Sequence, residues 1–166
     1  SQQGLELIPV MEDLGIILDV SHLNKPGFED VVKTSTKPFI ASHSNAHKIC
    51  PIPRNLLDDQ IESIASADGV IGINFYNKFL VHGVDPSSAS INDVIAHISY
   101  VTDLVGVKHV GVGSDFDGIS MTPRGLEDVS KMKELPVSLE KEGFGKHDIG
   151  KIMGGNLERV FLKIWK

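Results

Sequence analysis

The chain has 166 residues, of which 41% are hydrophobic, so it is long enough to bury the core of a single domain over residues 1–166. Its 22 acidic residues outnumber the 16 basic ones, and the resulting formal net charge of −6 argues against nucleic acid as a partner. The one cysteine, Cys50, excludes an intramolecular disulfide and a cysteine-cluster metal site and fits a cytoplasmic location, and no apolar run reaches the roughly 18 residues of a transmembrane segment.

Short apolar runs alternate with helical patterns along the chain. The runs are rich in β-branched residues and apolar nearly throughout, which is typical of parallel strands buried on both faces. The predicted strands are residues 15–20, 38–42, 69–76 and 109–114. The predicted helices are residues 5–14, 26–34, 55–68, 90–104, 126–142, 146–153 and 156–165.

Local signals support several of these helix boundaries. Pro26 lies near the start of its helix, where a missing N–H is harmless. Asn55 and Ser90 are predicted N-caps, and Gly69 is expected to end the helix of residues 55–68 in a left-handed conformation.

Four strands that alternate with helices predict βαβ units with right-handed crossovers, and hence an α/β fold. Two closures of the sheet fit this pattern. An open doubly wound sheet could stand alone at this size. A closed (β/α)₈ barrel needs about 250 residues, so four units would form half of one.

Three chemically active side chains follow predicted strands directly: His22, His43 and Asp115. Ligands of α/β folds gather at the carboxyl ends of parallel strands, and neutral imidazole is the commonest protein ligand of zinc-like metals. The two histidines could therefore share an ion, with Asp115 acting on a metal-bound water. The alternative is that each histidine only caps a strand or makes a hydrogen bond. His47 completes an H-x-x-x-H pair with His43, but the glutamate of H-E-x-x-H is missing.

The segment Asp115-Phe116-Asp117-Gly118 permits a second interpretation. A D-x-D-G loop after a strand resembles the nucleophile loop of haloacid-dehalogenase-like phosphatases, in which the first aspartate attacks phosphorus. Those enzymes place the loop early in the chain, whereas only about fifty residues follow it here. A simple turn with Asp117-Gly118 at its corner also explains the segment.

Two further segments bring polar groups toward the same edge of the sheet. Arg54 precedes a predicted helix and could hold a substrate carboxylate through two hydrogen bonds, or it could simply be solvated. Residues 74–77 (NFYN) end the third strand, where they either line a pocket or terminate the strand.

Seven strings of residues, in this order, resemble the C-terminal half of the membrane (renal) dipeptidase family of zinc peptidases. They are Asp19-Val20-Ser21-His22, Ser42-His43-Ser44, Arg54-Asn55 with Asp58-Asp59, Asn74-Phe75-Tyr76-Asn77, Gly113-Ser114-Asp115-Phe116-Asp117-Gly118, Gly125-Leu126-Glu127-Asp128-Val129-Ser130, and Gly155-Asn156-Leu157 with Arg159-Val160-Phe161. The resemblance implies the C-terminal half of a metallo-dependent-hydrolase TIM (β/α)₈ barrel. It also implies a metallopeptidase that cleaves dipeptides at a dinuclear zinc centre, where a metal-bridging hydroxide attacks the peptide carbonyl.

The resemblance assigns a role to each candidate site residue. His22 and His43 correspond to the histidines of one of the two zinc ions. Arg54 corresponds to the arginine that holds the dipeptide's carboxylate. Asp115 corresponds to the aspartate that moves a proton from water toward the leaving amine. Phe79 stands where some members have a substrate-contacting tyrosine, so that contact would lose its hydroxyl.

The family's other metal ligands, an H-x-D pair and a bridging glutamate, belong to an N-terminal half of the barrel that this sequence lacks. The chain begins Ser-Gln-Gln-Gly without methionine, and a missing N-terminus could have carried a signal peptide. A half-barrel exposes open edges, so we expect a longer enzyme, a separate N-terminal polypeptide, or self-association as a homo-oligomer. A noncatalytic half-barrel that serves binding or assembly is the alternative function.

Overall fold

Three short parallel strands form the centre of the fold in the computed structural model, which describes residues 1–165. The strands are β1 (Ile40–Ala41), β2 (Val70–Ile73) and β3 (Val110–Val112), in the order β1-β2-β3. β2 pairs in parallel with both neighbours, so that Ile71 lies beside Ala41 on one side and Val110 on the other. The predicted α/β class with a parallel sheet is confirmed.

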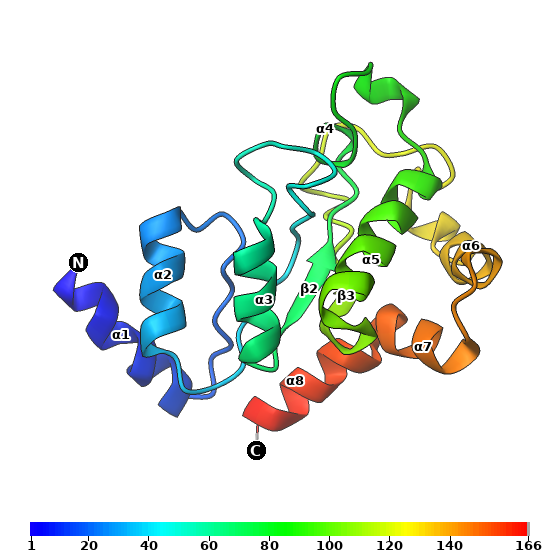
Figure 1. The fold of residues 1–166 in the computed structure, drawn as a ribbon. Helices are drawn as coiled ribbons and strands as arrows, with labels where there is room; N and C mark the ends of the chain where they lie inside the picture. Colours follow the sequence, from blue (N-terminus) through cyan, green and yellow to red (C-terminus); the bar gives the residue numbers. More distant parts are fainter. Residues whose placement is uncertain (166) are drawn as a thin grey trace.

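Helices precede, connect and follow these strands (Figure 1). The α-helices are α1 (Gln2–Asp13), α2 (Lys25–Thr34), α3 (Asp58–Ser66), α4 (Asn77–Leu80), α5 (Ile91–Val105), α6 (Glu134–Glu142), α7 (Lys146–Gly150) and α8 (Asn156–Ile164). Short 3₁₀ turns η1 (Pro86–Ser88), η2 (Val107–His109) and η3 (Val129–Lys131) and a π-helical segment η4 (Lys151–Gly155) complete the connections. No helix within residues 1–165 combines the length and the apolar character needed to cross a membrane.

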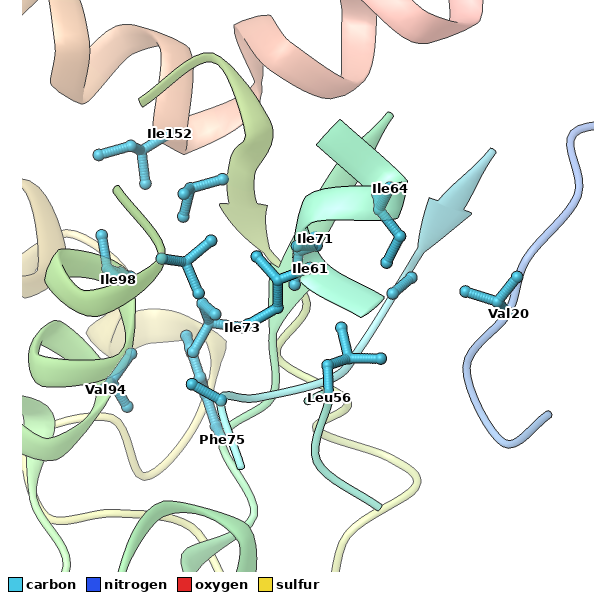
Figure 2. Close-up of a cluster of buried hydrophobic side chains, with 14 of the residues drawn as sticks. Val20, Leu56, Ile61, Ile64, Ile71, Ile73, Phe75, Val94, Ile98 and Ile152 are labelled. Atoms are coloured by element: carbon cyan, nitrogen blue, oxygen red, sulfur yellow. The ribbon is translucent and has the colours of Figure 1, made fainter. Parts of the chain in front are cut away.

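The main hydrophobic core lies between the sheet and the two helices α3 and α5, which flank β2 in Figure 1. Figure 2 shows side chains from these elements converging. Ile71 and Ile73 of β2, Ile61 of α3 and Ile98 of α5 are fully buried in this cluster. Because each buried isoleucine contributes about 1.5–3 kcal/mol relative to exposure, this core fixes the strands that carry the polar residues at their ends.

Helix α8 packs across the amino ends of the strands. Its Val160 and Ile164 form a second apolar cluster with Ile40 and Val70, the first residues of β1 and β2. The opposite, carboxyl ends of the strands are therefore the ends at which the loops can build a site.

A network of charges joins α8 to the same amino ends. Asp68, just before β2, lies 2.7 Å from Lys108 and 2.9 Å from both Arg159 and Lys163. Arg159 also donates to the main-chain oxygens of Asp68 and Lys108, each at 3.0 Å. Burial raises the pKa of Asp68, but the hydrogen bonds and positive charges of these partners outweigh it and lower the pKa to about 2.

In the described part of the chain the sheet has three strands, one fewer than the four predicted. Residues 15–20 form only an isolated bridge, in which Asp19 pairs in parallel with Ile40. Within residues 1–165 this segment has a pairing partner on one side only, and the chain turns away at His22, so no longer ladder forms.

One predicted helix end differs as well. Asp68, and not Gly69, adopts the left-handed conformation after α3, with φ of 60°. Gly69 is needed for a different reason, because a Cβ atom there would lie 2.0 Å from the main-chain oxygen of Phe39. The predicted cap of α5 is confirmed: Ser90 and Asp93 form a capping box at its start.

Candidate functional site

His22 and His43 meet at the carboxyl ends of two neighbouring segments of the sheet. His22 follows the bridged segment, and His43 follows β1. Their Nε2 atoms are 2.8 Å apart, and the ring centroids are separated by 4.9 Å. Two nitrogen ligands of one tetrahedral zinc ion are about 3.3 Å apart, so a small opening of this pair would admit an ion.

Two of the predicted site residues have a left-handed backbone. φ is 68° at His22 and 62° at Asp115. Glycine adopts this region without steric cost, whereas a residue with a Cβ atom keeps it only where the surrounding structure holds it in place, as at many functional sites. No local sequence signal indicated either conformation.

Asp115 follows β3 and is held by a buried asparagine from the end of β2. Asn74 is fully buried, and its Nδ2 donates to Asp115 Oδ2 at 3.0 Å. Asn74 is itself fixed by Asn45, whose side chain accepts from the Asn74 N–H at 2.8 Å and donates to the Asn74 carbonyl at 3.0 Å. The sequence analysis noted residues 74–77 as a polar segment but did not predict that Asn74 would orient Asp115. The only available signal was the position of the Asn74 amide immediately after a predicted strand.

Arg54 lies on the loop before α3, next to His43. Its guanidinium lies 5.5 Å from the ring centre of Phe79, and its Nη2 is 3.5 Å from the main-chain oxygen of His43. Arg54 Nε is buried and has no hydrogen-bond partner within residues 1–165. A hollow of about 190 Å³ is lined by both His22 and Arg54. The arginine therefore lines a cavity together with one histidine of the pair.

Buried polar side chains anchor the loop that carries Arg54. Asn55 Nδ2 donates to the carbonyl oxygen of Phe79 at 2.9 Å, so Asn55 is not the N-cap that the sequence predicted. His97 Nδ1 accepts from the Ala46 N–H, and its Nε2 contacts the Leu80 carbonyl, both at 3.1 Å. Burial lowers the pKa of His97 to about 4, so this histidine is neutral near pH 7 and plays a structural part.

The electrostatics of the site favour a neutral His43. Burial lowers the pKa of His43, as do His22 and Arg54, while the carboxylates of Asp115 and Asp19 act in the opposite direction. The neutral imidazole is the form that binds a metal ion. Asp115 also influences the pKa of Arg54, which burial lowers, so these groups share one electrostatic environment.

The remaining polar residues lie beside this group. Asp117 is exposed in a turn closed by the Gly118 N–H, which donates to the Asp115 carbonyl at 2.9 Å. Asp115 and Asp117 border a hollow of about 730 Å³ that Glu127 and Asp128 also line. His47 uses its main-chain N–H to bond the Leu56 carbonyl and belongs to the loop after β1.

A second layer of residues, which the sequence did not single out, surrounds the histidines. Asp19 Oδ2 lies 2.5 Å from Ser42 Oγ, and Ser42 Oγ lies 2.7 Å from His43 Nδ1. Both residues stand in strings that carry the family resemblance, but nothing in their spacing indicated that they would meet. Within residues 1–165, no cluster of three or more His, Cys, Asp or Glu side chains could hold a metal ion.

The chain as a whole is similar to known proteins. A family model described as "Membrane dipeptidase (Peptidase family M19)" matches residues 1–165. The chain is 38% identical over 164 residues to the Klebsiella pneumoniae "Uncharacterized protein in pqqA 5'region", covering 98% of this chain and 60% of that protein. It is 39% identical over 160 residues to Dipeptidase aclJ of Aspergillus oryzae, covering 96% of this chain and 38% of that protein.

A solved structure is also similar. The crystal structure of a metallopeptidase from Rhodobacter sphaeroides, liganded with a phosphinate mimic of the dipeptide L-Ala-D-Ala, matches with a TM-score of 0.94 at 35% identity. The match covers 99% of this chain and 47% of that one. The chain thus spans between 38% and 60% of the length of these three proteins.

Proposed function

The chain belongs to the membrane dipeptidase family, peptidase family M19, and on this premise we propose that the full-length protein is a metal-dependent dipeptidase. The observation that best supports the proposal is the distance of 2.8 Å between His22 Nε2 and His43 Nε2, beside a hollow that His22 and Arg54 line. The Rhodobacter relative, whose structure contains a dipeptide mimic, supports a dipeptide as the substrate.

We propose that His22 and His43 bind one of two zinc ions. The two imidazoles supply two ligands, and residues 1–165 bring no third metal-binding side chain close enough to complete the site. The other ligands would come from the N-terminal half of a TIM barrel, and the chain spans 38% to 60% of the length of the relatives that it matches. When bound, the metal ions would polarise the peptide carbonyl and lower the pKa of the attacking water.

Arg54 would hold the free carboxylate of the dipeptide. A guanidinium pairs with a carboxylate through two parallel hydrogen bonds, and Arg54 Nε has no partner within residues 1–165. The ring of Phe79 limits where the guanidinium can move. This contact would fix the distance between the carboxylate of the substrate and its peptide bond.

Asp115 would carry the proton. Attack by water forms a C–O bond and breaks the C–N bond, so a proton must pass from the water to the leaving amine. Asp115 can accept the proton and then release it to that amine, as a general base and then a general acid. Asn74 Nδ2 donates to Oδ2 at 3.0 Å, and no hydrogen bond within residues 1–165 engages Oδ1, which would exchange the proton.

Metal analysis and hydrolysis of L-Ala-L-Ala and L-Ala-D-Ala by the full-length protein test the proposal. His22→Ala and His43→Ala are each expected to lower the bound metal and abolish most of the hydrolysis, because each removes a ligand. Arg54→Ala is expected to raise the KM for a dipeptide with a free carboxylate. A dipeptide whose carboxylate is blocked as an amide is expected to be a poor substrate of both wild type and Arg54→Ala, with the same KM for each. His47→Ala is the control, since His47 lies outside the pair.

Unchanged metal content and rate in both histidine variants would contradict the site assignment. A full-length protein without any hydrolysis would favour the noncatalytic binding or assembly module instead. Phosphatase activity that depended on Asp115 and Asp117 would favour the alternative drawn from the D-x-D-G loop, which the M19 family match does not support.

A further inference from the structure

We propose that Asp19 and Ser42 are positioning residues that keep the proton of neutral His43 on Nδ1, so that the lone pair of Nε2 faces the metal site. This inference rests on the proposed function, because it assigns a task to two residues that do not themselves reach substrate or metal. The proposal is based on a continuous series of contacts from the Asp19 carboxylate, through the Ser42 hydroxyl, to the His43 imidazole.

The distances define the chain. Ser42 Oγ lies 2.5 Å from Asp19 Oδ2 and 2.7 Å from His43 Nδ1. His43 Nε2, on the far side of the ring, lies 2.8 Å from His22 Nε2. One nitrogen of His43 therefore faces the Asp19–Ser42 pair, and the other faces its partner histidine.

Counting protons fixes the direction of these hydrogen bonds. A carboxylate can only accept, and a serine hydroxyl has a single hydrogen to donate. The Ser42 hydroxyl must therefore donate to Asp19, which leaves its oxygen as an acceptor for an N–H at His43 Nδ1. A neutral imidazole carries one N–H, so His43 Nε2 retains its lone pair.

Asp19 also fixes the backbone beside both histidines. Its Oδ1 accepts from the N–H of Ser21 and from the N–H of Ser42, each at 3.0 Å. Ser21 Oγ accepts from the His43 N–H at 3.0 Å. Because Ser21 precedes His22 and Ser42 precedes His43, a single carboxylate joins the two turns that carry the histidines.

An asparagine at position 19 separates a positioning role from a merely structural one. The amide oxygen of Asn can still accept from the two main-chain N–H groups, so the turns keep their link. Its NH₂ group can only donate to Ser42 Oγ, which turns the hydroxyl toward His43 Nδ1 and moves the imidazole proton to Nε2. Asp19→Asn thus reverses the direction of the hydrogen bonds from residue 19 through Ser42 to His43, with little change in the size or shape of the side chain at position 19.

The tautomer can be read directly in the full-length protein. With ¹⁵N-labelled histidine, the NMR shifts of the His43 ring nitrogens in the metal-free protein near pH 7 are expected to show Nδ1–H for wild type and Nε2–H for Asp19→Asn. Zinc affinity, measured by competition with a chelator, is expected to fall about 10- to 100-fold in Asp19→Asn.

Serine variants keep the test informative even if Asp19→Asn does not fold. Ser42→Ala removes the hydroxyl and leaves the carboxylate, so His43 is expected to populate both tautomers and to lose zinc affinity. Ser42→Thr restores the hydroxyl and is expected to restore Nδ1–H and the affinity. Asp58→Asn is the matched control, because Asp58, at the start of α3, accepts from the Tyr100 hydroxyl at 2.8 Å and makes no hydrogen bond to Asp19, Ser42 or His43 within residues 1–165.

Retention of the Nδ1–H tautomer in both Asp19→Asn and Ser42→Ala would overturn the proposal, as would zinc affinities within twofold of wild type in both. A wild-type protein that fails to hydrolyse dipeptides would contradict the proposed function instead. The two failures are distinguishable because the NMR measurement requires neither metal nor substrate.

Discussion

A left-handed backbone is found at His22 and at Asp115, one of the two proposed metal ligands and the proposed proton carrier. In each case a strand ends and the chain turns sharply, so the side chain is directed to the edge where the loops meet. A residue with a Cβ atom pays about 1–2 kcal/mol for this conformation. The function proposed for each side chain explains why glycine does not stand at either position.

We therefore expect His22→Gly to be more stable than His22→Ala by about 1 kcal/mol, because both lose the imidazole and only glycine relieves the strain. Urea unfolding of the two full-length variants measures the difference. His43, which does not have a positive φ, is the matched position, and there alanine is expected to be the more stable replacement. A His22→Ala variant more stable than His22→Gly would contradict this account.

At the scale of elements, Asp68 joins the loop before β2 to α8 through three cations. Its pKa, lowered to about 2, lies below the ordinary value of 3.8, so the folded state favours the ionised form. The resulting stability is fully present above about pH 3.8 and is lost as the pH falls through about 2. The network thus holds α8 against the amino ends of the strands at any pH near neutrality.

Asp68→Asn is expected to lower the free energy of unfolding by about 1–2 kcal/mol at pH 7, after allowance for the partly exposed lysines. Asparagine tolerates the left-handed conformation of position 68, so the loss would reflect charge and not backbone strain. Unfolding in urea at pH 7, 4.5 and 3 should show a constant difference from wild type down to pH 4.5 and about half of it at pH 3.

Asp103→Asn serves as the control, because Asp103 is exposed on α5 and forms no ion pair within residues 1–165. A difference between Asp68→Asn and wild type that stayed the same down to pH 3 would show that charge is not the cause.

At the scale of the whole molecule, the sheet has free edges. Within residues 1–165 the segment bridged to β1 has no partner on its outer side, and β3 pairs only with β2. Large apolar side chains are exposed beside the first of these edges, including Leu14 at 71% and Trp165 at 63%. Open edges with exposed apolar groups are sites at which another polypeptide pairs or aggregation begins.

The 166-residue chain by itself is therefore expected to self-associate, whereas the same chain produced with the upstream half should form a defined species with one copy of each half. Size-exclusion chromatography with light scattering distinguishes the two. A stable monomer of the 166-residue chain alone, with a cooperative unfolding transition, would contradict the proposal that half a barrel is missing.

The α/β class, the alternation of strands and helices, the positions of His22, His43 and Asp115 after apolar runs, and the position of Arg54 before a helix could all be predicted from the sequence. These features depend on local periodicity and on which residue follows an apolar run, and both can be read along one chain. The sequence analysis overestimated the first strand and misassigned Asn55, because pairing and long-range hydrogen bonds decide such positions.

Which side chains come into contact depends on the packing of the whole fold. The hydrogen bond from Ser42 to Asp19 joins residues that are 23 positions apart in the sequence. The hydrogen bond from Asn74 to Asp115 joins residues that are 41 positions apart. Neither contact has a local signature, because each requires the register of parallel strands, which is set by the packing of α3 and α5 on the sheet. Backbone strain at His22 likewise follows from the position of its turn in three dimensions and not from the identity of its neighbours in the chain.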